Sequence, residues 1–521
     1  MEIALKEKSM YVWLVLAALL IWTNAVEAAC TGSSPTWTAA SPSSADVAAC
    51  VTVAKSGDTI RVPAGSGSVN WSTPPNLPNT KGLTILGPGA GSLTINNSKA
   101  WIAYCSASKP HRISGFRFTG TPSGGSHISV EGTCSGFRID HNIFYNVPNG
   151  YEAISVNAGV ALEGPLYGLI DNNQFVSTGG NFRAINMNSG GMDYGVRTNW
   201  RNESHLGTAN NIYIEDNVFD YATQDDGGSG AVDSNSEAAW VFRFNTVKNS
   251  SIKSHGVCNS EGTANQSAYY NTFVATSGVT NGYRMIHQQG SGEAMVFANR
   301  FTAASSKSAS AFEILHYRSA NASAAGCSLY PRCDGSAANA AWDQNRSPAA
   351  TYKGYRCRYQ PGSRGGPNGT TLLSPIYAWN NIWTDNGQKV SINIEDAWNV
   401  GTPTVQDHVK ANRDFYDAVS NTAQTSPTSP FNGTTGVGFG TLANRPTTCT
   451  TNPDEPGGGV GYWATDQGEW NSKNAGPDGQ LYRCSATNVW TLHYTPFTYP
   501  HPLQTGGSPV PPAPTNLRML N

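Results

Sequence analysis

A six-residue pattern of apolar and polar positions recurs along the chain, first as "IDHNIF" at Ile139 and last as "AWNNIW" at Ala378. It consists of an aliphatic or aromatic residue, two variable and mainly polar positions, an asparagine, one further position and usually an aromatic residue. Its central asparagines are Asn142, Asn173, Asn217, Asn245, Asn271, Asn299 and Asn381. Several intervals between them are 26 to 31 residues, the length of one strand-rich coil in a solenoid. The pattern therefore predicts stacked coils of short β-strands.

Each part of the pattern has an expected structural role. The asparagine should tolerate a left-handed turn and hydrogen-bond to its equivalent in the next coil, while the aromatic residue should stack inside. The longer gaps, Asn173 to Asn217 and Asn299 to Asn381, should contain loops that leave the coil. The charged residues beside the asparagines, Asp140, Asp171 and Glu215, are expected on a solvated face.

The two ends of the chain differ from this repeat. Residues 44–51 form a short amphipathic pattern before the first Gly-closed strands, which predicts a helix that caps the first coil. Beyond residue 420 the composition shifts to Thr, Ser, Pro and Gly, and then aromatic and polar residues alternate. This predicts a small β module whose aromatic residues form either a sugar-binding platform or a hydrophobic cap; they are Trp463, Trp470, Tyr482, Trp490 and Tyr494.

The N-terminus and the cysteines indicate export. Lys6 and Lys8 precede an apolar run and small residues near position 28, which predicts a signal peptide over residues 1–28. A membrane anchor is the rival interpretation, although the run is shorter than the ~20 residues of a spanning helix. Ten cysteines favour disulfides, with Cys30–Cys50 and Cys449–Cys484 as the expected local pairs and one more pair among Cys327, Cys333 and Cys357. We therefore expect a secreted or cell-surface protein, extracellular or periplasmic, that has no membrane contact once the signal is cleaved.

A net charge of −2 and a charged fraction of 13% give no electrostatic reason to bind nucleic acid. Polar side chains instead recur on a second strand of each coil, where alternation places them in one outward line. This line is expected to contain Ser129, Ser155, Asn186, Asp233, His255, His287 and His316, with Lys253, Arg284, Glu313 and Arg318 as neighbours. Three of only ten histidines in one line point to a site.

The repeat behind a signal peptide resembles the right-handed parallel β-helices of the pectate-lyase-like superfamily, over about residues 45–420. The segments "DSNSEAAWVFRFNTV", "YAWNN", "NRDFYD" and "YTPFTYPHPLQ" are similar to an exported bacterial β-helix group without an assigned activity. The resemblance implies an all-β fold, a right-handed single-stranded parallel β-helix with an N-terminal helical cap and a small C-terminal β module. The predicted domains are 1–28 signal peptide, 29–420 β-helix with an insertion at about 307–374, 421–504 disulfide-pinned module and 505–521 Pro-rich tail.

Two resemblances suggest chemistry. Lys253-Ser254, Asn271-Thr272-Phe273, Arg284 and His287 follow the order seen in alginate lyases and chondroitinase B. That order implies that Lys253 removes the C5 proton of a uronate and that Arg284 neutralises its carboxylate or assists the leaving oxygen. The acidic calcium ligands of that family are absent, since Thr246 and Lys248 stand in their place.

The second resemblance is to the order of motifs in polygalacturonases. This chain has that order in Asp225-Asp226, His255-Gly256 and Arg284, but it lacks that family's Asn-Thr-Asp motif. That order implies an inverting hydrolase, whose two carboxyls must lie about 6.5 to 9.5 Å apart. A non-catalytic glycan-binding or surface protein is the third interpretation.

The candidate catalytic residues are therefore Lys253, His255, Arg284, His287 and Asp233, and the candidate substrate-binding residues are Asn186, Asn235, Glu313, His316 and Arg318. The expected partner is a polysaccharide. No cofactor is required by these patterns, but Ca²⁺ or another divalent metal stays an option, with Asp233 and the three histidines as ligands for zinc or copper. The insertion, with Arg318, Trp342, Tyr355 and Arg358, is expected either to close over a groove or to form a disulfide-braced surface loop.

Overall fold

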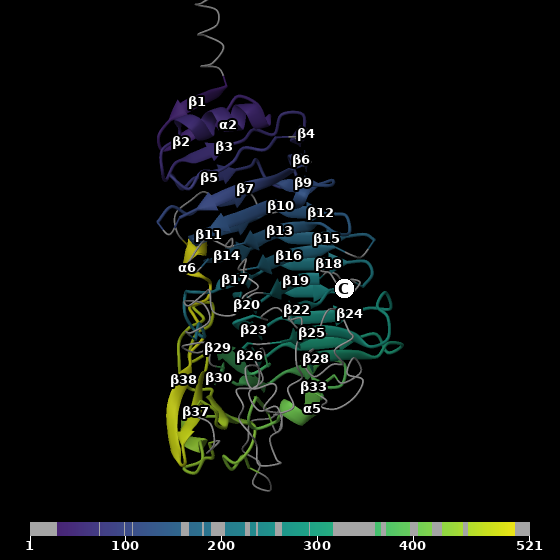
Figure 1. Cartoon of the computed structure of the whole chain (residues 1–521), viewed down its shortest axis with the longest axis vertical. Coiled ribbons are helices and arrows are strands. Elements are labelled where there is room, and N and C mark those ends of the chain that lie inside the picture. Colours follow the sequence, from purple (N-terminus) through teal and green to yellow (C-terminus); the bar gives the residue numbers. More distant parts are fainter. Residues whose placement is uncertain are drawn as a thin grey trace, which may run out of the picture.

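The computed structural model describes residues 29–71, 73–97, 99–106, 108–157, 166–179, 182–188, 204–224, 230–235, 238–255, 263–290, 292–315, 360–365, 371–395, 405–418, 430–451 and 457–505. These residues form an all-β fold of long parallel sheets, as in a parallel β-solenoid (Figure 1). Each complete coil contributes one strand to each of three sheets, which we call A, B and C.

Sheet A has thirteen strands. They are β1 (Cys30–Ser33), β2 (Thr36–Ala39), β3 (Thr59–Arg61), β5 (Thr84–Leu86), β8 (Arg112–Ser114), β11 (Ser135–Asp140), β14 (Tyr167–Asp171), β17 (Ile212–Glu215), β20 (Ala239–Arg243), β23 (Asn265–Tyr269), β26 (Ala294–Phe297), β31 (Ile376–Trp379) and β34 (Phe415–Asp417). All neighbours are parallel except the β1–β2 pair, against which helix α2 (Ser44–Val53) lies.

Sheet B has ten parallel strands. They are β4 (Ser68–Trp71), β6 (Thr94–Asn97), β9 (Arg117–Thr119), β12 (Ile143–Tyr145), β15 (Gln174–Ser177), β18 (Val218–Tyr221), β21 (Thr246–Lys248), β24 (Thr272–Ala275), β27 (Arg300–Ala303) and β32 (Ile382–Trp383).

Sheet C has nine parallel strands and lies between the other two sheets in the view of Figure 1. They are β7 (Lys99–Cys105), β10 (Ser123–Gly132), β13 (Glu152–Asn157), β16 (Arg183–Asn188), β19 (Gly230–Asn235), β22 (Ile252–His255), β25 (Tyr283–Gln289), β28 (Ala309–Leu315) and β33 (Asn393–Ile394).

Smaller elements follow the coils. The hairpin β29 (Ser363–Gly365) and β30 (Thr371–Leu373) precedes β31, and the short helix α5 (Val405–His408) precedes β34. A four-stranded sheet contains β35 (Val437–Gly440), β36 (Gly461–Ala464), β37 (Gln480–Ala486) and β38 (Val489–Tyr494), with the 3₁₀ turn η5 (Leu442–Asn444) between its first two strands. The last described element is α6 (Pro502–Thr505).

The seven asparagines form one hydrogen-bonded column at the bend between sheets A and B. The side-chain oxygen of Asn173 accepts from the backbone N–H and from the amide group of Asn142, at 3.0 and 3.1 Å. The same pair of bonds recurs at every step to Asn381. This confirms the predicted contact between coils.

The left-handed conformation is at a different position from the one expected. In each coil the residue before the asparagine has the positive φ, for example 53° at Asn172 and 56° at Phe244. The asparagine therefore recurs because its side-chain amide forms hydrogen bonds with two coils at once. The residue before it is the one that must adopt the left-handed conformation.

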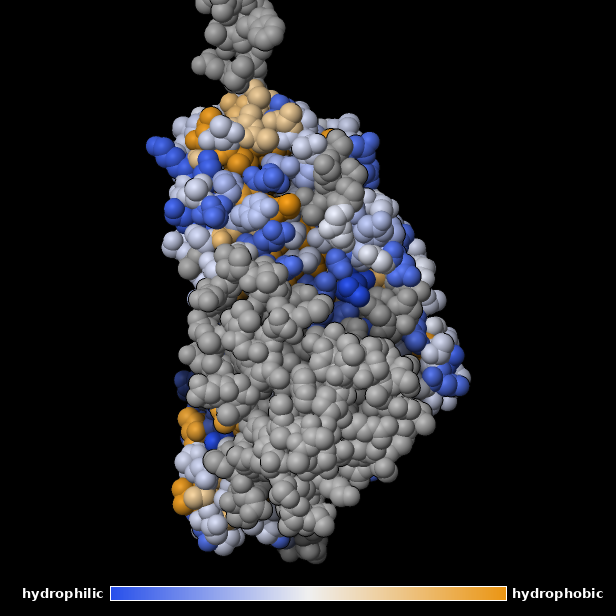
Figure 2. Space-filling view, in the orientation of Figure 1, coloured by the Kyte–Doolittle hydropathy of each residue, from blue (hydrophilic) through white to orange (hydrophobic). Residues whose placement is uncertain are grey.

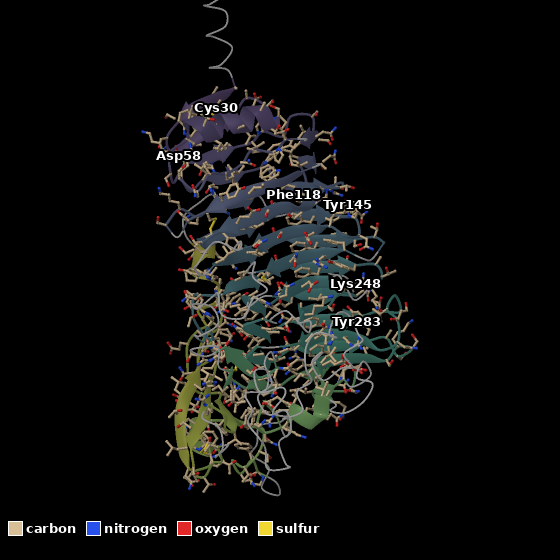
Figure 3. All side chains as sticks on the ribbon, viewed as in Figure 1. Cys30, Asp58, Phe118, Tyr145, Lys248 and Tyr283 are labelled. Atoms are coloured by element: carbon tan, nitrogen blue, oxygen red, sulfur yellow. A yellow bond between two sulfur atoms is a disulfide. The ribbon has the colours of Figure 1, made fainter. Side chains whose placement is uncertain are left out.

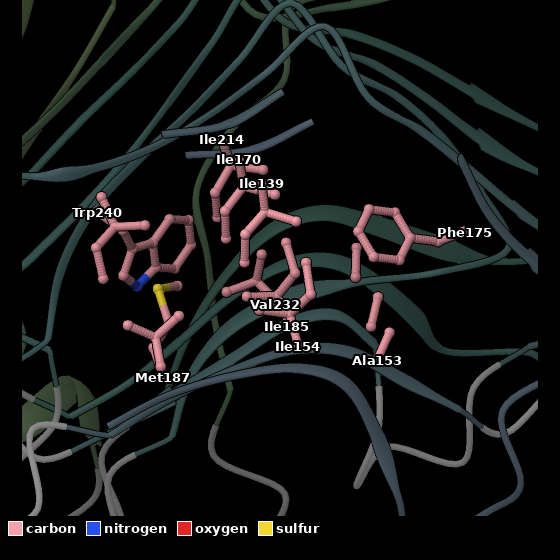
Figure 4. Packing of buried hydrophobic residues seen from close by; sticks show 14 of the residues in the cluster. Ile139, Ala153, Ile154, Ile170, Phe175, Ile185, Met187, Ile214, Val232 and Trp240 are labelled. Atoms are coloured by element: carbon pink, nitrogen blue, oxygen red, sulfur yellow. The ribbon is translucent and has the colours of Figure 1, made fainter. Parts of the chain in front are cut away.

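The interior is filled by columns of apolar side chains. Phe118, Phe144, Phe175 and Phe219 stack with ring centroids 5.2, 5.1 and 4.7 Å apart. Figure 4 shows this packing, with isoleucines of sheets A and C facing the ring of Phe175. The predicted aromatic stack is thus inside the solenoid.

Both long gaps in the repeat are insertions between adjacent coils, because β14 pairs directly with β17 and β26 with β31. The second insertion begins later than the predicted residue 307, since residues 309–315 form β28 of sheet C. Residues 316–359 lie outside the described residues.

Disulfides join Cys30 to Cys50 and Cys449 to Cys484, as predicted, and Cys105 to Cys134, which was not. Cys30 lies at the N-terminal end of the described chain (Figure 3). The predicted pair among Cys327, Cys333 and Cys357, and the predicted signal peptide, lie outside the described residues.

The outer face of sheet A is not solvated, which corrects the expectation for Asp140, Asp171 and Glu215. All three are fully buried and pair with Arg112, Arg138 and Arg243. A C-terminal segment, residues 495–505, covers this face and ends at α6 beside β11 (Figure 1). We call this segment the strap.

Buried charges hold the strap. The Arg243 guanidinium donates to the carbonyl oxygens of Phe497 (2.6 Å) and Thr498 (2.9 Å), while its Nε pairs with Glu215 at 2.6 Å. Glu215 in turn accepts from the backbone N–H of His501 at 2.8 Å. The backbone groups of the strap thus form hydrogen bonds with side chains, in place of the bonds that a neighbouring strand would supply.

Replacing Phe273 with Ala should cost about 3 to 5 kcal/mol of unfolding free energy, because its ring is fully buried between Phe242 and Phe301. Urea denaturation followed by circular dichroism measures this. Thr272→Ala, at the exposed position next to it, is the control and should be near neutral. Equal stability of both variants would contradict the interior position of Phe273.

Arg243→Gln should cost about 3 to 5 kcal/mol, because Glu215 is left buried without its cation. It should also expose the strap to protease, which mass spectrometry of limited digests detects as cleavage within residues 495–505. Arg300→Gln, at an exposed position on sheet B, is the matched control. A strap that stays protected in Arg243→Gln would show that the buried arginine does not hold it.

Candidate functional site

The outward positions of sheet C form one continuous row, because successive strands pair in parallel register. The row contains Ser129, Ser155, Asn186, Asp233, Lys253, His287, Glu313 and Asn393. Four adjacent coils therefore place Asp233, Lys253, His287 and Glu313 side by side, about 4.8 Å apart along the sheet.

The register corrects two positions of the predicted line. Lys253, and not His255, pairs with both Asp233 and His287. His255 pairs with Gln289, two positions further along the strands, and its side chain lies outside the described residues. Glu313 takes the place expected for His316, which lies outside the described residues together with Arg318.

The row is buried although it points away from the solenoid interior. Asp233, Lys253, His287 and Glu313 are exposed by only 3%, 2%, 6% and 2%. Figure 2 shows a strongly hydrophilic patch on this face at the level of β16. Charges buried to this extent are stable only when paired, so their partners define the site.

Arg183 joins two acids at the N-terminal end of the charged part of the row. Its Nη1 lies 3.0 Å from a Glu152 oxygen and its Nε 3.1 Å from an Asp233 oxygen. Asn186 donates to Glu152 at 3.3 Å. Burial raises the pKa of Glu152 and the charge of Asp233 adds to this, while Arg183 acts in the opposite direction.

Arg284 joins two other acids at the opposite end. Its Nε pairs closely with Glu313, and its Nη2 lies 3.2 Å from Glu395. Asn393 donates to the second oxygen of Glu313 at 3.0 Å. Burial raises the pKa of Glu313 and the nearby Glu395 adds to this, whereas Arg284 and Asn393 lower it.

His287 lies between Glu313 and Gln289. Its Nε2 is 3.4 Å from Glu313 Oε1, and its Nδ1 is 2.9 Å from Gln289 Nε2. Lys253 is the neighbour of His287 on the preceding strand. The arrangement therefore puts a cation and an imidazole backed by a carboxylate at adjacent positions, a combination suited to proton transfer.

The structure thus brings together Asp233, Lys253, His287, Arg284, Glu313 and Asn186 of the predicted residues. Asn235 lies two positions beyond Asp233 on β19 and is half-buried. Sequence reasoning missed Glu152, Arg183, Gln289 and Glu395. A signal was present for two of them, because Glu152 and Arg183 occupy the same position in the aligned strands "EAISVN" and "RAINMN".

Two other expectations concern metals and aromatic residues. Among the described residues no three His, Cys, Asp or Glu side chains are grouped closely enough to hold a metal ion.

The sugar-platform interpretation is wrong for Trp463, Trp470 and Tyr494, which are buried against Phe297 and Tyr269 of sheet A as a hydrophobic cap. Tyr482 and Trp490 are half-buried and contact Arg445.

Comparison with protein-family models and with curated proteins finds no match to this chain. Within the described part of the chain, no helix has the length and apolar character needed to cross a bilayer. The three disulfides fit a protein of an oxidising compartment.

Glu313→Gln should change the dependence of stability on pH. Because the pKa of Glu313 is raised in the folded state above its usual 4.5, the native protein holds a proton that the unfolded chain has lost. This contribution to stability falls as pH rises from about 4.5 upward. The melting temperature of Glu313→Gln relative to wild type should therefore be higher at about pH 7 than at about pH 4.

Thermal melts at both pH values measure this difference. Glu469→Gln, at an exposed position, is the control and should follow wild type at both. A difference between Glu313→Gln and wild type that is the same at both pH values would show that Glu313 titrates normally.

Proposed function

We propose that this chain is an exported polysaccharide-active protein of the right-handed, pectate-lyase-like β-helix type, and that it cleaves a uronate-containing glycan by β-elimination. The single observation that carries the proposal is the direct pairing of Lys253 with His287 on adjacent strands, in a buried row of titratable side chains. Crowded and buried titratable groups of this kind are more often functional than structural.

Elimination requires a base beside C5 of the uronate, and Lys253 is the residue of the row that we propose for it. Lys253, once deprotonated, takes the proton from C5 of the uronate; the C4–O4 bond breaks, a C4=C5 double bond forms, and the leaving oxygen receives its proton from the Lys253 ammonium so formed. The C5 anion that develops is stabilised by neutralising the adjacent carboxylate. Asn186 and the serines earlier in the row are suited to hydrogen-bond neighbouring sugar hydroxyls.

Arg284 takes a different role from the one that the resemblance implies. Its guanidinium is bound to Glu313 and Glu395, so its charge is already compensated within the protein. It orders Glu313 beside His287. We therefore propose Arg284 as a positioning residue, and not as the cation that neutralises the uronate carboxylate.

A glycoside hydrolase is the second candidate, favoured by the Glu152–Arg183–Asp233 group. One guanidinium holds both carboxylates, and the raised pKa of Glu152 beside the carboxyl group of Asp233 resembles an acid paired with a base or nucleophile. Asp233 and Glu313 are a poorer pair, because three coil spacings separate their Cα atoms by about 14 Å. The alternative pair Asp225-Asp226 lies outside the described residues.

The domain division stays a prediction, with a β-helix over 29–420 and a separate module over 421–504. The strap covers the outer face of sheet A and contacts the bend residues Asp216 and Phe244.

A glycan panel tests the proposal. Polygalacturonate, alginate, chondroitin and neutral glycans are incubated with the purified chain, and both the ultraviolet absorbance of the unsaturated product and new reducing ends are followed. We expect unsaturated product from one of the uronates, and a fall in turnover per molecule of folded protein of about 10² to 10⁴ in Lys253→Ala. Lys248→Ala, on sheet B (Figure 3), is the matched control and should keep full activity.

The outcomes separate the candidates. Reducing ends without unsaturated product, lost in Glu152→Gln but kept in Lys253→Ala, would establish the hydrolase. Retention of a glycan without any cleavage would leave only the binding interpretation.

A further inference from the structure

We propose that Gln289 is a positioning residue that fixes His287 in one tautomer, with Nδ1 unprotonated and the proton on Nε2, the nitrogen that lies 3.4 Å from Glu313. The imidazole is then a hydrogen-bond donor in the resting site, and Lys253 is left as the base. The consequence for catalysis rests on the proposed function, whereas the tautomer itself does not.

The contact between Gln289 and His287 sets the tautomer. An amide nitrogen only donates, so Gln289 Nε2 at 2.9 Å from His287 Nδ1 requires a lone pair on Nδ1. A neutral imidazole carries one proton, which must then be on Nε2. The second nitrogen of a histidine is commonly set in this way by the bond that the first one makes.

Gln289 is itself held in place. It follows His287 by two positions on β25, so both side chains leave the same face of sheet C. Its backbone N–H donates to Ser254 Oγ on the neighbouring strand at 3.2 Å, and the residue is only 6% exposed. A glutamine held at this site can direct its amide without the entropy of an exposed side chain.

Glu313 completes the arrangement on the other side of the ring. Its Oε1 is 3.4 Å from His287 Nε2, and its Oε2 accepts from Asn393. The distance is longer than a strong hydrogen bond, as is common for catalytic groups before substrate binds. A proton on Nε2 suits this carboxylate acceptor, whereas a lone pair there would face the carboxylate unfavourably.

The tautomer of His287 distinguishes between His287 and Lys253 as the base, a choice that their residue types alone leave open. An imidazole whose Nδ1 is occupied by Gln289 and whose Nε2 carries a proton has no free lone pair for a substrate C–H. Lys253, one strand away in the same row, is the remaining candidate. Loss of Gln289 should therefore alter the tautomer of His287 first and turnover second.

Nitrogen-15 spectroscopy of the full chain tests this directly. The protein is labelled at the histidine ring nitrogens, and His287 is assigned by the signal that disappears in His287→Asn. Two-bond proton–nitrogen correlations at a pH where the ring is neutral distinguish the tautomers. We expect the Nε2–H form in wild type, the Nδ1–H form in Gln289→Glu, whose carboxylate can only accept, and a mixture in Gln289→Leu.

Gln174→Leu, on sheet B, is the matched control and should leave the His287 signals unchanged. Wild-type His287 with its proton on Nδ1 would overturn the inference, because Gln289 would then present its oxygen. This result needs no variant of Gln289, so it stands even if Gln289→Glu fails to fold. Absence of cleavage in the glycan panel together with the Nε2–H form would count against the proposed function alone.

Discussion

The asparagine column is the interaction on which the remaining structure depends. Each amide closes the bend between sheets A and B in its own coil and bonds to the coil beside it, and the residue before it takes the left-handed conformation. Because strand side chains alternate with a period of two, a slip of one residue would turn every interior side chain outward. The column prevents such slips, and so it determines which side chains enter the row on sheet C.

Charges are buried on two outer faces of the solenoid, with different consequences. On sheet A, the pairs Arg138–Asp171 and Arg243–Glu215 are complete and bind the backbone of the strap. On sheet C, each arginine is shared by two acids, and a lysine and a histidine lie between these groups. The first arrangement satisfies polar backbone groups that pair with no strand. The second concentrates titratable side chains on one face of sheet C.

The sequence predicts the coils well because the repeat is a physical requirement of stacking. The asparagine and phenylalanine positions and the two local disulfides follow from it or from chain proximity. The outward row was predicted at Ser129, Ser155, Asn186, Asp233 and His287, but not at Lys253 or Glu313. The alternation gives both Lys253 and His255 the same face, so a shift of two residues leaves the pattern unchanged. Only the register of β22 with its neighbours decides between them.

The partners of the row were the least predictable part. Glu395 comes from the end of β33, more than one hundred residues after Arg284, and no local pattern connects them. Yet this contact bears directly on the proposed chemistry, because an arginine between two carboxylates has little charge left for a substrate. Arg183, at the other end of the row, likewise lies between two carboxylates. In the proposed elimination the base is therefore one of the two side chains between the arginines, and of these Lys253 is the one whose nitrogen, once deprotonated, has a lone pair not claimed by Gln289.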